Sequence, residues 1–113
     1  SNNYLKYLWS KFKIRRSYQS TKALLNKYDL DAFIGLTRGP AWKINYDGGD
    51  YVAMNESLQF GSGGFAAHNG MPHITIPYFE INDFPVGISI IGDRWFDKAI
   101  IEYASAIEKS RYN

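Results

Sequence analysis

The sequence contains no cysteine, and this absence removes several kinds of chemistry at once. A disulfide scaffold, a cysteine nucleophile and thiolate metal ligands are all excluded. No apolar run approaches the roughly 18 residues of a membrane-spanning helix. Lysines interrupt the apolar residues near the N-terminus, so no signal-peptide pattern is present. We therefore predict no membrane span, and a cytoplasmic location is only slightly favoured.

Acidic residues are absent from the first 28 positions, which hold seven basic residues. The rest of the chain is acidic overall, so the net charge of +2 hides an asymmetry. A basic arm can bind nucleic acid or an anionic membrane surface. We favour a solvated helix face, or a face that meets an acidic neighbour, because leucines and aromatic residues are interspersed with the charges as in a packed helix. We expect no nucleic-acid partner.

Hydrophobic residues are plentiful, at 45%, and aromatic residues make up 17% of the chain. A chain of 113 residues with this composition fits one folded domain, residues 1–113, with 1–3 set aside as a candidate expression remnant. Periodicity and turn residues predict helices and strands in alternation, which indicates an α/β fold. The predicted elements are a basic helix at 4–28, a strand at 32–36, a loop-rich stretch at 43–65, a short helix at 65–69, a strand at 73–77, a hairpin at 79–84, a strand at 85–92 and a helix at 97–110.

Local signals refine three of these elements. Residues 32–36 are apolar at every position, which is typical of a strand buried on both faces. Asn82-Asp83 is a turn signal for the hairpin, and Gly70 is a stop signal for the short helix. In the first helix we expect packed apolar positions at Leu5, Leu8, Phe12, Leu24 and Leu25. In the last helix we expect them at Ile100, Ile101, Ala104 and Ile107.

Three stretches carry a resemblance to a known family. Residues 30–42 are Leu-Asp-Ala-Phe-Ile-Gly-Leu-Thr-Arg-Gly-Pro-Ala-Trp, residues 66–77 are Ala-Ala-His-Asn-Gly-Met-Pro-His-Ile-Thr-Ile-Pro, and residues 84–92 are Phe-Pro-Val-Gly-Ile-Ser-Ile-Ile-Gly. Each is weak alone. Their order, their gaps and the helix after the third resemble the C-terminal region of amidase-signature enzymes, and Gly-Pro-Ala-Trp resembles the peptide-amidase-like members. Leu36 departs from the pattern, because the family usually has proline there.

The resemblance implies an α/β fold, with part of a mixed sheet and flanking helices, and the hydrolysis of linear carboxamides. Family members use a serine nucleophile, a second serine in a cis peptide and a lysine base, and they need no metal or organic cofactor. These groups lie upstream in a Gly-Gly-Ser-Ser-Gly-Gly type of sequence, which this chain lacks. We therefore expect no catalytic residue here. The intact enzyme would be an amidase, and this chain alone would be inactive.

Substrate contacts are expected from the loop after the first strand. The resemblance implies that segments after this strand help to wall the acyl-binding cavity. Trp42 would offer an apolar face there, although a place for it in the core agrees equally well with the sequence. The predicted substrate-binding residues are Thr37, Gly39, Pro40, Ala41, Trp42 and, more weakly, Gly61 and Ser62.

Other chemistry-bearing residues do not form a site. Ser62 falls where the family has a second small-residue stretch, so we expect a flexible or pocket-lining residue and not a nucleophile. His68 and His73 lie five residues apart with a proline between them, which is not the spacing of a helical metal pair. Asp47 and Asp50 flank two glycines without a calcium loop. We predict no metal site, and surface or packing roles for both histidines.

The family domain is several times longer than this chain, so we interpret the chain as its C-terminal segment. The upstream remainder would then be its partner, and the intact enzyme would bind a carboxamide. Separation from that remainder would expose a sheet edge and an apolar face, and we expect the isolated chain to form homo-oligomers by strand pairing or domain swapping. The alternative is a stand-alone, non-catalytic interaction protein that retains half of the amidase fold.

Overall fold

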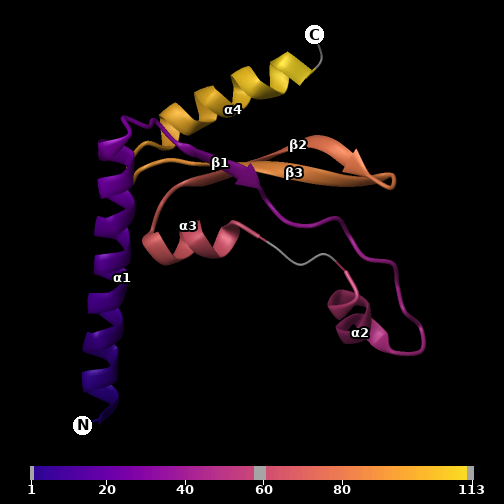
Figure 1. Cartoon of the computed structure of the whole chain (residues 1–113), viewed down its shortest axis with the longest axis horizontal. Helices are drawn as coiled ribbons and strands as arrows, with labels where there is room; N and C mark the ends of the chain where they lie inside the picture. Colours follow the sequence, from indigo (N-terminus) through magenta and orange to yellow (C-terminus); the bar gives the residue numbers. More distant parts are fainter. Residues whose placement is uncertain (1, 58–60, 112–113) are drawn as a thin grey trace.

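The computed structural model describes residues 2–57 and 61–111 (Figure 1). In chain order the elements are α1 (Asn2–Lys27), β1 (Phe33–Leu36), α2 (Gly49–Asn55), α3 (Gly63–Asn69), β2 (His73–Ile81), β3 (Phe84–Ile91) and α4 (Asp97–Arg111). This order confirms the predicted α/β class. The short helix α2 was not predicted, and it lies inside the stretch 43–65 that the sequence indicates to be loop-rich; residues 58–60 of that stretch lie outside the described residues.

The three strands form one sheet in the order β1-β3-β2, and both pairings are antiparallel. The predicted hairpin is confirmed, because Asn82 and Asp83 connect β2 to β3 with φ angles of 52° and 67°. Two successive positive φ angles are typical of a type I′ turn, which asparagine and aspartate tolerate. The hairpin register places His73 opposite Ile91 and Thr75 opposite Ser89. Side chains alternate between the two faces from these pairs as far as Pro77, after which the register shifts before Phe79.

One face of the sheet is apolar and is covered by α4. Ile76 on β2 and Ile90 on β3 form a buried cluster with Ile100 and Ala104 of α4. The helix begins close to the end of β3, and a Cβ atom added at Gly92 would lie only 2.5 Å from Cγ2 of Ile100. This close approach requires glycine at position 92. The predicted apolar stripe of the last helix is thus confirmed at Ile100 and Ala104.

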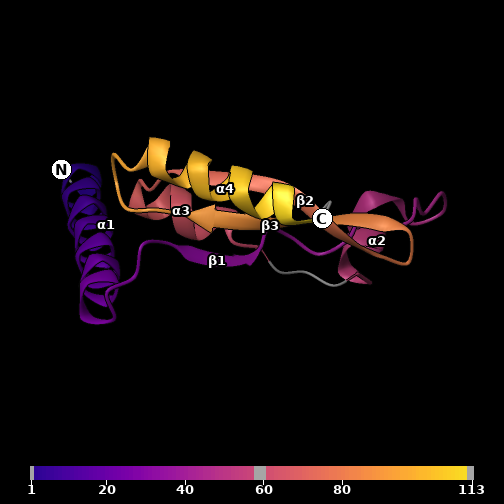
Figure 2. The same cartoon turned by 90° about the horizontal axis from the view of Figure 1, so that it is seen from above.

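On the side of the sheet opposite α4 lies α3, and α1 stands beside α3 at the end of the strands (Figures 1 and 2). Leu25, Ala66, Met71 and Ile91 form a second buried cluster between these elements and the sheet. The helix α3 ends at Gly70, whose φ of 63° lies in the left-handed region, as the sequence predicts for a glycine C-cap. The sheet is therefore covered on both faces near the end of β3, and this covered region is the core of the chain.

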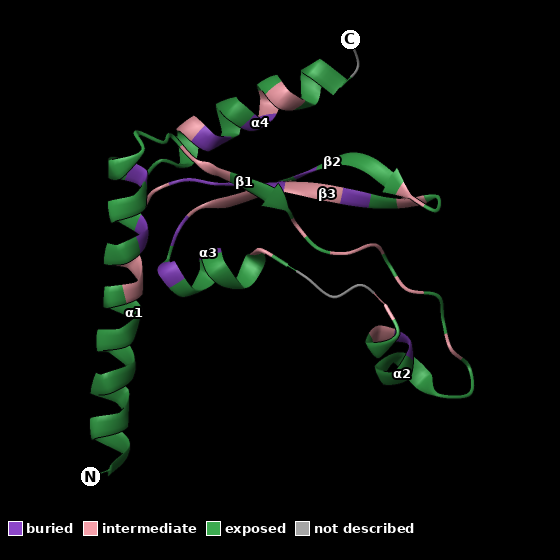
Figure 3. Cartoon of the chain, in the orientation of Figure 1, coloured by how far each residue is buried: buried purple, intermediate pink, exposed green. Residues whose placement is uncertain are grey.

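The first half of α1 extends beyond the rest of the molecule, and its residues are exposed (Figure 3). Leu5, Leu8 and Phe12 were predicted to be packed, and this prediction is wrong within the chain. The reason is geometric, because α3 lies beside the second half of α1 (Figure 1). Leu25 is buried as predicted. The same correction applies to Leu24 of α1 and Ile101 of α4, which are exposed.

The prediction that the first strand is buried on both faces is also wrong. The strand β1 is an edge strand paired with β3, and Ile34 on it is 64% exposed. The helix α4 packs against β2 and β3 and stops short of covering β1. A groove of about 370 Å³ remains between β1 and α4, lined by residues that include Ile34, Tyr103 and Ile107.

The molecule as a whole is flat and open. Its principal extents are 46 × 43 × 20 Å, and its radius of gyration is 17.6 Å. A compact domain of this length has a radius of gyration of about 13 Å. Its accessible surface of 8534 Å² likewise exceeds the roughly 6,300 Å² typical of a folded monomer of this mass. The chain therefore buries less of its surface than a self-contained domain of equal size.

Candidate functional site

The loop predicted to contact substrate leaves the sheet directly after β1. The backbone N–H of Thr37 donates to the carbonyl of Gly87 at 2.9 Å, which extends the β1–β3 pairing by one residue. The next residue, Arg38, forms an isolated antiparallel bridge with Gly61. Beyond it the chain turns away and encloses a cleft of about 430 Å³ lined by Arg38, Gly39, Pro40, Ala41 and Trp42.

Gly61 and Ser62 lie beside Thr37, so the structure brings these predicted residues together. The backbone N–H of Ser62 donates to the carbonyl of Thr37 at 3.1 Å. The Ser62 hydroxyl donates to the carbonyl of Leu36 at 2.9 Å. A backbone carbonyl is not a base, so this contact does not activate the hydroxyl as a nucleophile. Ser62 instead ties the start of α3 to the end of β1.

Trp42 is half-buried and lies outside both apolar clusters. The guanidinium carbon of Arg38 lies 5.2 Å from the centre of its ring, within the range of a cation–π contact. The same indole borders a second cavity of about 520 Å³. The other residues of this cavity belong to the loop after Trp42 and to α2 and its end: Lys43, Ile44, Asn45, Tyr46, Asp47, Ala53, Glu56 and Ser57. Trp42 thus stands between two adjacent cavities.

Thr37 also belongs to a polar cluster that sequence reasoning missed. Its hydroxyl lies 2.7 Å from Oγ of Ser89 on β3, and that oxygen lies 2.6 Å from Nε2 of His73 on β2. Thr75 completes the cluster, with Oγ1 at 3.3 Å from the Thr37 hydroxyl and at 3.4 Å from Nε2 of His73. The sheet register explains this meeting, because His73, Thr75 and Ser89 share one face. The sequence signal was only partial: polar His73 and Thr75 alternate in β2, and Ser89 is the one polar residue of the apolar strand β3.

The hydrogen bonds of this cluster hold its side chains in place, and the cluster does not expose a nucleophile. Ser89 is fully buried, so its hydroxyl is closed to an incoming substrate. A hydroxyl can donate one hydrogen bond and accept others, and Ser89 uses this capacity to join His73 to Thr37. The backbone is equally tight, since a Cβ atom at Gly87 would lie 2.7 Å from Cγ2 of Thr75 and 3.2 Å from Oγ1 of Thr37. These contacts hold Thr37 in one orientation at the base of the loop.

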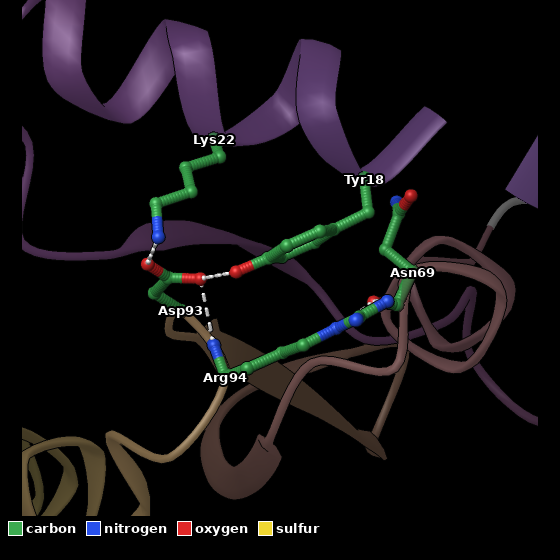
Figure 4. Close-up of polar contacts among 5 residues, drawn as sticks. All are labelled: Tyr18, Lys22, Asn69, Asp93 and Arg94. Atoms are coloured by element: carbon green, nitrogen blue, oxygen red, sulfur yellow. Dashed lines mark hydrogen bonds and ion pairs between the residues drawn. The ribbon is translucent and has the colours of Figure 1, made fainter. Parts of the chain in front are cut away.

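A second polar cluster joins α1 to α3 and to the segment between β3 and α4 (Figure 4). The Tyr18 hydroxyl donates to Oδ1 of Asp93 at 2.5 Å, and Nζ of Lys22 lies 3.8 Å from Oδ2 of Asp93. The guanidinium of Arg94 lies 3.7 Å from the centre of the Tyr18 ring and donates twice to the carbonyl of Asn69, at 2.9 and 3.0 Å. This cluster positions α1 and is not adjacent to the loop at 37–42.

The pKa values of Tyr18 and Asp93 in this cluster change in opposite directions. The hydrogen bond to Asp93 raises the pKa of Tyr18, and burial and the negative charge of Asp93 add to this effect. Burial by itself would raise the pKa of Asp93. Hydrogen bonds from Tyr18 and from the backbone N–H of Arg94, together with the charges of Lys22 and Arg94, outweigh burial and lower the pKa of Asp93.

Metal-binding and membrane-spanning features do not occur in the described ranges, 2–57 and 61–111. Within them no three His, Cys, Asp or Glu side chains gather as a metal site. None of the helices described there is long and apolar enough to cross a membrane. His68 is exposed, whereas His73 belongs to the polar cluster on the sheet.

Comparison with known proteins identifies the fold. No family model matches the chain. A stretch of 45 residues is 44% identical to one subunit of the glutamyl-tRNA(Gln) amidotransferase of Thermotoga maritima, covering 39% of this chain and 10% of that protein. The peptide amidase of Stenotrophomonas maltophilia matches 94% of this chain with a TM-score of 0.75 and 28% identity. The peptide amidase PAM, in complex with the competitive inhibitor chymostatin, matches 76% with a TM-score of 0.64 and 34% identity.

These matches define the class first: the chain has the fold of one segment of a larger α/β amidase domain. It spans about a fifth of the Stenotrophomonas enzyme, 16% of PAM and a tenth of the matched amidotransferase protein. These likenesses support the amidase signature family as the family of this fold.

Proposed function

We propose that this chain is the C-terminal part of an amidase that hydrolyses linear carboxamides. In this function it supplies scaffold and a wall of the substrate pocket, while the Ser–Ser–Lys catalytic centre lies in the upstream remainder. One observation carries the proposal: nearly the whole chain matches the fold of a peptide amidase, but the match covers only 20% of that enzyme. A segment of this kind contributes surfaces to a site more readily than a complete catalytic set.

The large exposed surface of the chain supports the proposal that further elements pack against it in the intact protein. A radius of gyration of 17.6 Å and an edge strand with Ile34 exposed are the properties of a sheet segment that is completed by other elements. The upstream remainder of the amidase domain is the partner that we propose for these surfaces. In its absence, the same edge would pair with a second copy, which gives homo-oligomers of the isolated chain.

The proposed pocket wall comprises the predicted substrate-binding residues, Thr37, Gly39, Pro40, Ala41, Trp42, Gly61 and Ser62. The cleft along 38–42 and the half-buried indole of Trp42 support this assignment, because ligand sites are mostly apolar with few polar groups. Ser89 and His73 would act indirectly, by holding the Thr37 hydroxyl. Ser62 would line the wall and would not attack the substrate.

A graft into the related enzyme tests the proposal. The segment of the Stenotrophomonas peptide amidase that matches this chain is replaced with the whole chain, α1 included, and ammonia release from peptide amides is measured. We expect the folded chimera to keep amide hydrolysis. Trp42→Ala in the graft should raise KM by about tenfold, the loss of one well-packed aromatic contact, with a smaller effect on kcat. Ser62→Ala should leave kcat within a few-fold. A soluble, folded chimera without activity would contradict the proposal.

The isolated 113-residue chain provides the complementary measurement. With the same peptide amides it should release no ammonia above a buffer blank. Turnover that disappears in Ser62→Ala would mean that the chain has a nucleophile of its own and that the proposal is wrong. An inactive chain together with an inactive, folded chimera would favour the stand-alone interaction protein.

A further inference from the structure

The exposed half of α1 carries an apolar seam of helical spacing. Leu5, Trp9 and Phe12 are separated by four and then three residues, which is the spacing of successive core positions in a coiled coil. They are 63%, 58% and 50% exposed. The rings of Trp9 and Phe12 stack with their centres 5.5 Å apart, so they form one continuous surface. Leu8 lies beside this seam and is also exposed.

The seam faces away from the body of the chain. Tyr18 follows Trp9 by nine residues, and Thr21 follows Phe12 by nine residues. Nine residues are about two and a half helical turns, so the members of each pair lie on opposite sides of α1. Tyr18 and Thr21 are on the side that packs onto the rest of the chain, through the hydrogen bond to Asp93 and through burial. When the side of α1 with Tyr18 and Thr21 packs on the chain, the seam on the opposite side must therefore remain exposed.

Basic residues flank the seam. Lys6, Lys13 and Arg15 occupy the positions next to the core of the heptad pattern, where charge selects the partner of a coiled coil. The ammonium of Lys13 lies 5.7 Å from the centre of a Trp9 ring. No acidic residue is present among positions 1–28, so every charge at the border of the seam is positive.

We propose that the seam Leu5–Trp9–Phe12 binds a helix that has apolar residues at matching spacing and acidic residues on both flanks. Charge complementarity favours this occupant. A second copy of α1 would place like charges in contact, which disfavours a dimer through this surface. The spacing of four and then three residues between the seam positions is that of a surface that packs against one helix, and this favours a helix over an anionic lipid surface.

Two synthetic peptides test the proposal with the 113-residue chain. Both have about four heptads with leucine at the core positions; one has glutamate and the other lysine at the flanking positions. Binding is measured by fluorescence anisotropy of the labelled peptide. We expect the chain to bind the glutamate peptide and not the lysine peptide, with an affinity that falls as salt increases. Equal binding of both peptides, or no binding of the glutamate peptide, would overturn the proposal.

Variants locate the contact on α1. Trp9→Ala and Phe12→Ala should each weaken binding of the glutamate peptide by at least about tenfold, as for a central aromatic residue in an interface. Tyr7→Ala is the matched control, because Tyr7 is an exposed aromatic residue on the other side of the same helix, and it should bind as the parent does. The double change Lys13→Glu with Arg15→Glu should reverse the preference between the two peptides. Circular dichroism checks that each variant keeps its helix content.

Two other occupants are measured in parallel. Sedimentation would reveal a dimer that is lost in Trp9→Ala, and flotation with phosphatidylserine vesicles would reveal lipid binding lost in the same variant. Either result would assign the seam to a second copy or to a lipid surface and would overturn the proposal. The proposal is supported if the chain binds the glutamate peptide selectively, does not bind the vesicles and forms no dimer that depends on Trp9.

Discussion

The fully buried hydroxyl of Ser89 on β3 joins Thr37, just after β1, to His73 on β2. Its oxygen is 2.7 Å from the Thr37 hydroxyl and 2.6 Å from Nε2 of His73. A buried polar group costs free energy unless it is paired, so each member of this cluster depends on the others. The orientation of Thr37, and with it the start of the 38–42 loop, follows from a residue that no substrate can touch.

Removal of this hydroxyl should be measurable in stability. Ser89→Ala is expected to lower the free energy of unfolding by about 1–3 kcal/mol, because two half-buried partners lose a hydrogen bond. Urea unfolding followed by circular dichroism measures this difference. Thr75→Ala is the matched control, since Thr75 is exposed and its contacts in the cluster are the longest, and it should cost less. Equal costs for the two variants would mean that Ser89 does not organise the cluster.

At the scale of elements, the attachment of α1 depends on the Tyr18–Asp93 contact. The contact connects α1 to the segment before α4, far apart in the sequence. Because the pKa of Asp93 is lowered in the folded chain, the unfolded chain binds more protons in acid, and stability rises with pH there. Because the pKa of Tyr18 is raised, the folded chain keeps its proton longer, and stability falls with pH in alkali.

Unfolding measured across pH tests this linkage. The stabilisation from Asp93 should be complete above its unfolded pKa of about 3.9 and should disappear as pH falls through the lower folded value. Asp93→Asn should therefore be less stable than the parent near pH 6, and the two should converge toward pH 2. Asp50→Asn, on the exposed start of α2, serves as control and should parallel the parent. A constant gap between Asp93→Asn and the parent at all pH values would contradict the argument.

Local turn and cap signals were sufficient to predict where the elements next to them begin or end. Asn82-Asp83 and Gly70 require left-handed backbone angles that few residues tolerate, so sequence alone locates the hairpin and the end of α3. The exposure of Leu5 and Ile34 was not predictable in this way. An apolar pattern records that a side chain needs cover, and it does not record whether the same chain supplies that cover.

Only part of the candidate site could be predicted from the sequence. The resemblance located the loop from Thr37 to Trp42, and contact between that loop and Ser62 is found in the structure. The role of the loop as a pocket wall stays a prediction. The polar cluster could not be predicted, because it depends on the register that places Thr75 opposite Ser89 and on the position of Thr37 beyond the end of β1. Such pairings between distant positions are set by tertiary structure.

At the scale of the whole molecule, the flat shape and the open edge of the sheet bear on its state in solution. The strand β1 pairs with β3 and leaves its other edge, with Ile34, beside an apolar groove of about 370 Å³. Unprotected edges of this kind promote strand pairing between molecules. The flanking charges on α1 oppose association through the helix, so the sheet edge is the surface on which we expect two copies to meet.

Sedimentation of the purified chain over a range of concentrations measures this association. We expect a species larger than a monomer at high concentration. Ile34→Lys should shift the equilibrium toward the monomer by at least about tenfold in the dissociation constant, because a lysine on an edge strand opposes pairing by charge and by desolvation. Ile44→Lys, which changes an isoleucine of similar exposure on the loop after Trp42, should leave the equilibrium unchanged. A monomer at every concentration, or association that both variants reduce equally, would show that β1 does not join the copies.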